Sequence, residues 1–343
     1  MNILLCSVPF RPSIGGIETV SLLLAERFER LGQRVVLVTR TESAAPDGDP
    51  FRVVRQPSLR RLLDLARWAD VVFHNNISLR LAWPLLLVEK PWVVAHHTWL
   101  PVMGTAGRAK RAALRHATNI AVSRAIADSL PVPSAVVPNP YADDTFVRMP
   151  DVARRGELVF VGRLVSDKGV STLLDALAIL ARGGQRVRLT VIGEGPEAPA
   201  LKAQAERLGI ASQVAFAGRR AGPELAASLN AHQVLVVPSV WEEPFGVVAL
   251  EAMACGCVPL VTKSGGLPDA VGAAGLVVQR AAPAALAEGI QTLLGDPARL
   301  EHYRAAAPAH LARHTRDQIA REYLGILDDA CRTHGTKSAA RAA

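Results

Sequence analysis

The chain has 343 residues, of which half are hydrophobic and a fifth are charged, a length and composition typical of a globular protein with two domains. No apolar run reaches the roughly 18 residues that a membrane-spanning helix requires. The apolar start Met1–Val8 has no basic leader, which argues against a secretory signal. The four cysteines match neither a zinc spacing nor a disulfide framework, which favours buried thiols and a cytoplasmic compartment.

The net charge is +8 and is unevenly distributed. Residues 1–150 hold 18 lysines and arginines against 12 acidic residues, and the remainder holds 21 against 19. This bias favours acidic partners such as phosphates, nucleic acid or anionic lipid head groups. A solvated, arginine-rich surface accounts for the same numbers equally well.

Short apolar runs alternate with amphipathic stretches through the first half of the chain. The paired glycines Gly15-Gly16 precede a helix predicted over residues 17–31, in which apolar residues recur at helical spacing. The apolar runs predict strands at Asn2–Val8, Arg34–Thr39, Val71–His74, Trp92–His96, Asn119–Val122 and Ala135–Val137. Such alternation predicts a parallel sheet covered by helices on both faces.

The alternation lapses between Pro138 and Gly156, which indicates a linker, and then begins again. The second series of predicted strands is Leu158–Val161, Arg188–Ile192, Val214–Ala217, Val234–Val237 and Val258–Val261. The sequence therefore predicts two doubly wound, Rossmann-like α/β domains, 1–150 and 151–315. We also expect a helix over 316–331 that packs back on the first domain, followed by a flexible tail at 332–343.

Loops that follow strands are where ligands bind in parallel sheets. Arg163 and Lys168 stand five residues apart in such a loop, just before a predicted helix. A guanidinium fork, a mobile ammonium group and a helix N-terminus together suit a diphosphate. The alternative is a surface loop with two solvated cations.

Glu243 and Glu251 flank the segment Pro-Phe-Gly, which ends at Gly246 and opens another predicted helix. The amides at such a helix start suit a phosphate or sugar oxygen. Glu251 lies about two turns along the helix among apolar neighbours, where a carboxylate requires a partner such as the hydroxyls of a ribose. The alternative is that Glu243 caps the helix and Glu251 is a surface residue.

Two features of the first half are weaker signals. Gly15-Gly16 would allow a phosphate to approach the backbone closely, although a tight turn explains them equally well. His97 follows the predicted strand Trp92–His96 and could contact a substrate there. A partial dinucleotide fingerprint at Gly193–Ala198 contains Pro196 and has no acidic ribose partner, so we predict no nicotinamide site.

Taken together, these residues resemble the glycosyltransferases of family 4, which are retaining enzymes with the GT-B fold. Gly162-Arg163 with Lys168-Gly169 resembles the diphosphate clamp of that family, and Glu243 with Glu251 resembles its E-x7-E motif. Gly265-Gly266-Leu-Pro-Asp269 is similar to a further family segment, and His97 and Asn139 occupy positions where the family has these residues. His232 stands where an aspartate is commoner. The resemblance implies two Rossmann-like domains that face a central cleft, with acceptor binding in the first and donor binding in the second.

The resemblance also implies residue roles. Arg163 and Lys168 would stabilise the departing diphosphate, and Glu243 and His97 would complete the catalytic set by contacting the sugar. Glu251 would bind the ribose, and Gly16 and the Phe245-Gly246-Val247 backbone would contact the donor phosphate and sugar. The donor would be a UDP- or GDP-sugar and the acceptor a sugar or lipid-linked molecule, in hexosyl transfer for cell-surface polysaccharide or glycolipid synthesis. We expect no cofactor and no metal requirement, since the two cations and a helix N-terminus could replace a metal ion.

Other functions remain open at this level. The chain could be another GT-B enzyme, such as a nucleotide-sugar epimerase or a phosphorylase, or a non-catalytic nucleotide-sugar-binding scaffold. The basic stretch Arg108–His116 has no interleaved aromatic residues, so we predict no nucleic-acid binding. It reads as an amphipathic helix, which leads to the hypothesis of peripheral contact with an anionic membrane on its inner, cytoplasmic face.

Overall fold

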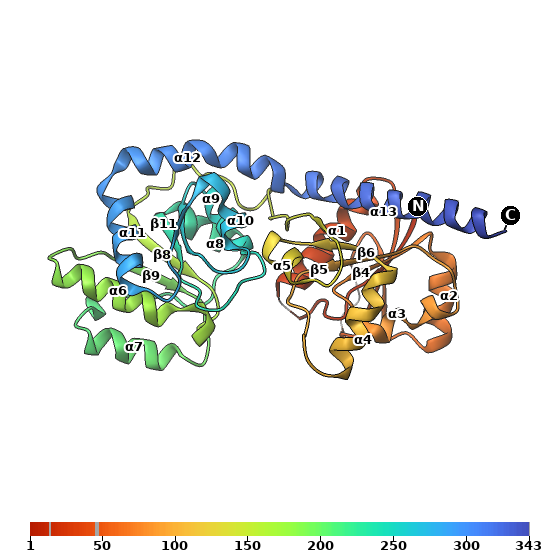
Figure 1. Ribbon diagram of the computed structural model, residues 1–343. Helices are drawn as coiled ribbons and strands as arrows, with labels where there is room; N and C mark the ends of the chain where they lie inside the picture. Colours follow the sequence, from red (N-terminus) through yellow and green to blue (C-terminus); the bar gives the residue numbers. More distant parts are fainter. Residues whose placement is uncertain (14, 45–47, 343) are drawn as a thin grey trace. The chain divides into compact units, whose positions relative to one another are not determined.

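A computed structural model describes residues 1–13, 15–44 and 48–342 (Figure 1). The chain forms two compact units: unit 1 comprises Met1–Pro140 and Arg316–Ala343, and unit 2 comprises Tyr141–Thr315. The sequence placed the end of the first domain at residue 150, ten residues later. The intervening segment belongs to unit 2 because Met149 N donates to Asn230 Oδ1 at 2.7 Å and Asn230 Nδ2 donates to Val147 O at 2.9 Å.

Unit 1 is built on a parallel sheet of seven strands in the order β3-β2-β1-β4-β5-β6-β7. Its strands are β1 (Asn2–Cys6), β2 (Arg34–Thr39), β3 (Arg52–Arg55), β4 (Val71–Asn75), β5 (Trp92–His96), β6 (Thr118–Ala121) and β7 (Ala135–Val136). The strand order reverses between β1 and β4, which is the switch point where such sheets bind ligands.

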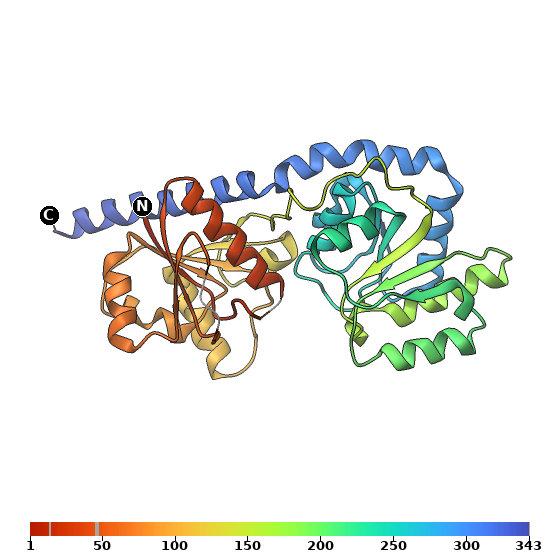
Figure 2. The same cartoon turned by 180° about the vertical axis from the view of Figure 1, so that it is seen from behind.

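Helices cover both faces of this sheet, as the continuous apolar strands predict. Ile3 and Leu5 face α1 (Gly16–Arg30) and α13 (Arg316–Ala342), whereas Leu4 and Cys6 face the opposite side. Figure 2 shows α1 in front of the strands. The remaining helices are α2 (Leu59–Trp68), α3 (Leu79–Ala82), η1 (Trp83–Leu86), α4 (Thr105–Ala113), η2 (Leu114–His116) and α5 (Arg124–Ser129).

The last helix, α13, lies in unit 1 although it follows unit 2 in the chain. Tyr323 and Leu327 are fully buried in the core that α13 shares with α1 and the sheet, and Arg27 of α1 pairs with Asp317 at 3.1 Å. The sequence predicted a flexible tail from residue 332. Instead the helix continues to Ala342, with Arg332 paired to Asp328 one turn earlier at 2.6 Å.

Unit 2 repeats the design with a parallel sheet of six strands in the order β10-β9-β8-β11-β12-β13. Its strands are β8 (Gly156–Val161), β9 (Leu189–Ile192), β10 (Val214–Phe216), β11 (His232–Val237), β12 (Val258–Thr262) and β13 (Leu276–Val278). Its main helices are α6 (Val170–Arg182), α7 (Ala198–Arg207), α8 (Gly222–Asn230), α9 (Val247–Ala254), α10 (Leu267–Val271), α11 (Pro283–Gly295) and α12 (Pro297–Leu311). Here the order reverses between β8 and β11, so the loops after these two strands lie at the switch point.

The structure confirms the predicted fold class: two doubly wound, Rossmann-like α/β units. In unit 2, α6 and α11 pack together over one face of the sheet and contribute to one apolar core (Figure 1). Among residues 1–13, 15–44 and 48–342, no helix combines the length and apolarity that crossing a membrane requires.

Candidate functional site

The loop after β8 carries Arg163 and Lys168 and leads into α6 through the short helix η3 (Ser166–Lys168). Gly169 caps α6 with a φ of +70°, and a Cβ atom on it would lie 2.0 Å from the carbonyl oxygen of Pro238. Only glycine fits there, because both the backbone angle and the contact exclude a side chain. This close approach joins the loops after β8 and β11, which are also linked by a hydrogen bond from Val240 N to Asp167 O (3.0 Å).

Lys168 and Glu243, 75 residues apart in the sequence, are in direct contact at this junction. Lys168 Nζ donates to Glu243 Oε1 at 2.5 Å, and Ser239 Oγ donates to the same oxygen at 2.7 Å. Both side chains of the pair are partly buried, at 24% and 15% exposure. The sequence assigned Lys168 and Glu243 to one site but gave no reason to expect this pairing, and it gave Ser239 no role.

Gly246 and Phe245 form the start of α9. Gly246 has a φ of +116°, and a Cβ atom on it would lie 2.5 Å from the side chain of Leu267. Phe245 is buried and stacks on His314, with ring centroids 6.0 Å apart. The first turn of a helix leaves its amides, here those around Val247, without intrahelical acceptors and with partial positive charge. The segment is therefore a candidate anion-binding position beside the Lys168–Glu243 pair.

Arg163 and Glu251 are charged residues at the site that the protein itself does not neutralise. Within the described part of the chain, neither makes a hydrogen bond or an ion pair. Arg163 is exposed. Glu251 is half-buried on α9, and removal of its carboxyl from water raises its pKa to about 7. A carboxylate in this state gains stability from any ligand hydroxyl that donates to it.

His97 lies directly after β5, at the carboxyl edge of the unit 1 sheet. Its Nδ1 contacts Asn139 Oδ1 at 2.9 Å, and its backbone N donates to Asn76 Oδ1 at 2.7 Å. Burial lowers the pKa of His97 to about 4, with the adjacent His96 contributing, so the ring is neutral near pH 7. If Nδ1 carries the proton for Asn139, Nε2 is an acceptor, and this buried atom has no partner within residues 1–13, 15–44 and 48–342.

Gly16 forms the first turn of α1 at the same edge of the sheet. Apart from its chain neighbours and its own helix backbone, a Cβ atom on Gly16 would meet no atom of the described residues within 4 Å, so the described side chains do not require a glycine there. Asn75 Nδ2 donates to Ile17 O of this turn at 3.3 Å, while the next residue, Asn76, holds the backbone of His97. Sequence reasoning missed these two asparagines. Their signal was a polar pair at the end of a buried strand, with Asn75 as its last residue.

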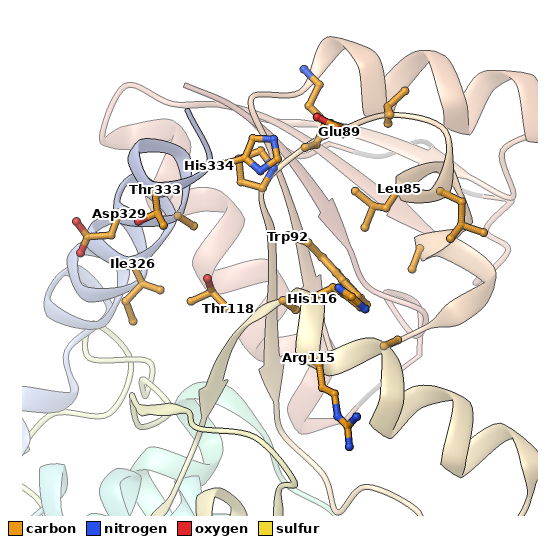
Figure 3. A pocket seen from close by; sticks show the side chains of 18 of the residues that line it. Leu85, Glu89, Trp92, Arg115, His116, Thr118, Ile326, Asp329, Thr333 and His334 are labelled. Carbon is orange, nitrogen blue, oxygen red and sulfur yellow. The ribbon is translucent and has the colours of Figure 1, made fainter. Parts of the chain in front are cut away.

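A groove of unit 1 lies at the opposite edge of its sheet. It has a volume of about 1170 Å³ and opens at the amino ends of β5 and β6, where Trp92 and Thr118 stand, opposite the edge that carries His97 (Figure 3). Trp92, Leu85 and Ile326 line it together with Arg115 and His116. Ligands of doubly wound sheets bind at the carboxyl edge, so this groove is not the candidate site.

Comparison with known proteins finds a family model that matches most of unit 2. Residues 151–310 match the family model described as Glycosyl transferases group 1. A D-inositol 3-phosphate glycosyltransferase of Segniliparus rotundus is 38% identical over 180 residues, which are 50% of this chain and 40% of that protein. A glycogen synthase of Mycobacterium tuberculosis is 39% identical over 172 residues, 48% of this chain and 41% of that protein. The chain thus matches about two fifths of the length of these relatives.

Solved structures share the fold of the whole chain. Anabaena Alr3699/HepE in complex with UDP has a TM-score of 0.83 at 23% identity and covers 96% of this chain, with all of that chain aligned. A sucrose-phosphate synthase of Thermosynechococcus elongatus has a TM-score of 0.79 at 22% identity, covering 96% and 98%. The chain has the GT-B fold, and its residues 151–310 match the model of the glycosyl transferases group 1 family.

Proposed function

We propose that the protein is a retaining glycosyltransferase that moves a sugar from a UDP- or GDP-sugar to a sugar or lipid-linked acceptor. The observation that carries this proposal is the contact between Lys168 and Glu243 at 2.5 Å, beside the N-terminus of α9. Lys168 suits the negative charge of the donor diphosphate, and Glu243 can accept hydrogen bonds from the sugar hydroxyls. The amides at the start of α9 can donate to the phosphate oxygens.

Negative charge grows on the diphosphate as its bond to the sugar breaks. Lys168 is held by Glu243 and the first amides of α9 are held by the helix before the reaction, and together with the exposed Arg163 they would stabilise that charge. In the ligand-free protein Glu243 neutralises Lys168. The donor phosphate would take over Lys168, and Glu243 would then accept hydrogen bonds from the sugar. Glu251, which has no protein partner in the described residues, would accept hydrogen bonds from the ribose hydroxyls.

Retention is proposed to occur by attack from the face that the diphosphate leaves. The bond between the anomeric carbon and the diphosphate oxygen breaks, the acceptor oxygen bonds to that carbon, and the acceptor proton passes to the departing phosphate. In this scheme Glu243 accepts hydrogen bonds from the sugar and from Ser239, so the proposal gives it no role as a nucleophile. His97 would contact the donor sugar through its unpartnered Nε2, and Gly16 would lie against the donor phosphate.

The comparisons support the same class of donor. The solved structures with this fold include complexes of Anabaena Alr3699/HepE with UDP and with UDP-glucose. The matched relatives are named as glycosyltransferase and glycogen synthase. A role in polysaccharide or glycolipid synthesis is part of this proposal.

The test is nucleotide release. The purified chain is incubated with UDP- and GDP-sugars, with and without sugar or lipid-linked acceptors, and free nucleoside diphosphate and product are measured. We expect release that depends on the acceptor and a product with the donor's anomeric configuration. Conversion of the donor to an isomeric sugar without a glycosylated acceptor would favour an epimerase. Tight donor binding without turnover on any acceptor would favour a scaffold.

Membrane contact is the second part of the proposal and rests on α4 and its flanks. Residues 90–127 contain no aspartate or glutamate. Arg108, Lys110 and Arg111 on α4 make no ion pair within the described residues. Val102 and Met103, which precede the helix, are 72% and 87% exposed. Cations beside exposed apolar side chains suit a surface of anionic lipids, which would place the protein at the inner face of the membrane.

Co-sedimentation with vesicles tests this contact. We expect binding to vesicles that contain phosphatidylglycerol, loss of binding in high salt, and weak binding to neutral phosphatidylcholine. Replacing Arg108, Lys110 and Arg111 with glutamine should abolish it, whereas the same change at the exposed Arg60 and the partly buried Arg61 of α2 should not. Failure of the wild-type chain to bind anionic vesicles at low salt would refute the contact and leave the proposed sugar transfer untouched.

A further inference from the structure

The chain passes between the two units at only two crossing points, Pro140–Tyr141 and Thr315–Arg316. These points are joined within unit 2, because Tyr141 N donates a hydrogen bond to His314 O at 3.3 Å. A rearrangement of one unit relative to the other must involve the backbone at these points. His314 is therefore hydrogen-bonded to the first crossing point and directly precedes the second.

The ring of His314 connects this position to the donor segment. It is 4% exposed and stacks on Phe245 with an interplanar angle of 30°. Phe245 immediately precedes Gly246, which opens α9. His314 Nδ1 donates to His310 O at 2.8 Å, and since a carbonyl only accepts, the proton of the neutral ring is on Nδ1.

His310, one turn earlier, holds the other side of Gly246. Its Nε2 donates to Ala270 O at 2.8 Å, and its Nδ1 accepts from Arg313 at 3.1 Å. Ala270 belongs to α10, the helix whose Leu267 lies against Gly246. The two histidines thus contact both walls of the turn at Gly246: His314 contacts Phe245 on one side, and His310 contacts α10 on the other.

Packing alone does not require imidazoles here. Leucine or phenylalanine would fill a buried position without the cost of removing polar nitrogens from water. Burial lowers the pKa of both histidines, so they are neutral rings near pH 7. Each forms a directional hydrogen bond to a carbonyl, and satisfied buried polar groups of this kind fix one arrangement rather than merely filling space.

We infer that His314 is a positioning residue that couples the crossing points between the units to the donor-binding segment Phe245-Gly246-Val247. The inference rests on the proposed function for what the segment binds, but not for the coupling itself. His314 contacts neither phosphate nor sugar in this scheme. Its ring contacts Phe245, whose backbone sets the direction of the α9 amides. Its carbonyl accepts from the amide of Tyr141, so a change in the backbone at the first crossing point would alter this hydrogen bond.

Three variants of the full chain test this. His314→Ala removes the stack, and His314→Phe restores an aromatic ring on Phe245. His232→Ala is the matched control, because His232 is another buried histidine of unit 2 that donates to a backbone carbonyl, that of Ser228, at 2.7 Å. Amide hydrogen exchange of the ligand-free proteins is measured over 245–250 and at Tyr141, together with the KM and kcat for donor and acceptor.

We expect His314→Ala to accelerate exchange in both segments and to raise the donor KM about two- to tenfold, the range for loss of one aromatic pair, with the acceptor KM unchanged. His314→Phe keeps the ring on Phe245 but loses the hydrogen bond to His310 O, so its donor KM should lie between the values of His314→Ala and wild type. Unchanged exchange at 245–250 in folded His314→Ala, or an equal effect of His232→Ala, would overturn the inference. If the wild-type chain releases no nucleotide from any donor, the proposed function fails, and the exchange measurement still decides the coupling.

Discussion

Lys168 and Glu243 form an ion pair at the centre of the candidate site. Replacing either residue with alanine therefore leaves the charge of the other residue without its partner. We expect Lys168→Ala to lower kcat/KM by about 10²- to 10³-fold, the usual cost of removing one group that stabilises developing charge. Glu243→Ala should cause a comparable loss. The measurement is nucleotide release with the preferred donor and acceptor. Lys202→Ala is the control, because Lys202 lies on α7 over the ring of Phe216. A fully active Lys168→Ala variant would remove the basis of the proposed site.

The raised pKa of Glu251 predicts that the stability of the protein depends on pH. Its pKa in the folded protein is about 7, compared with 4.5 in the unfolded chain, so the folded state binds more protons between these values. Stability from this residue is therefore present at low pH and is lost as the pH rises from about 4.5 through 7. Glu251→Gln should raise the free energy of unfolding by about 1–3 kcal/mol at pH 8, with the gain shrinking towards pH 4.

Urea unfolding at several pH values checks this prediction. Glu206→Gln, which changes an exposed carboxylate on α7, controls for the general loss of one negative charge. A gain for Glu251→Gln that is the same at pH 4 and pH 8 would contradict a buried, ionising carboxyl at this position. The same raised pKa implies that donor binding releases protons near pH 7, because ribose hydroxyls stabilise the charged form.

At the scale of elements, α13 provides the sharpest test of the fold. Tyr323 is fully buried, packs on Phe73 with ring centroids 5.6 Å apart, and has a hydroxyl without a hydrogen-bond partner in the described residues. Tyr323→Ala should lower the free energy of unfolding by about 3–5 kcal/mol because it leaves a cavity. Tyr323→Phe should be neutral or stabilise by about 1 kcal/mol, since it removes an unsatisfied polar group. Denaturant unfolding distinguishes the two, and destabilisation by Tyr323→Phe would mean that the hydroxyl has a partner.

Strands and helices with long apolar runs could be predicted from the sequence. Elements that are defined by pairing with another strand, or that lack an apolar pattern, could not. β1, β5 and β11 are buried on both faces, so their apolar runs are continuous. The edge strand β3 (Arg52–Arg55) begins and ends with arginine and was missed, since its pairing with β2 is what defines it. The continuation of α13 beyond residue 331 was missed because small polar residues carry no apolar periodicity.

At the scale of the whole molecule, the proposed roles divide between the units. UDP should protect amides around 162–170 and 245–251 of unit 2 from hydrogen exchange, and also those around 15–18 of unit 1, because Gly16 is assigned to the donor phosphate. UDP-glucose, or whichever sugar donor proves active, should add protection around 96–98, because the sugar and not the nucleotide is assigned to His97. Exchange mass spectrometry with UDP and with the donor measures the difference. Equal protection of residues 96–98 by both ligands would contradict this division.

The residues of the candidate site could be proposed from the sequence, but the contacts between them could not be predicted. Arg163, Lys168, Glu243 and Glu251 stand at recognisable spacings, and the fold places them on adjoining elements of unit 2. The contact between Lys168 and Glu243 depends on the backbone approach at Gly169, a tertiary property. Asn76 contacts the backbone of His97 through one hydrogen bond, and His314 contacts Phe245 through its ring. Such isolated tertiary contacts produce no motif or periodicity in a single sequence.

The placement of α13 has a consequence for synthesis on the ribosome. The face of the unit 1 sheet that includes Phe73 and Val93 is completed only by residues up to Ala330. After Pro140 has been made, about 190 further residues must follow, which takes about 10–40 s at ordinary elongation rates. During that time unit 2 can fold completely while the sheet of unit 1 still exposes apolar surface. The first strands of the chain therefore remain open to aggregation or to chaperone binding long after they have left the ribosome.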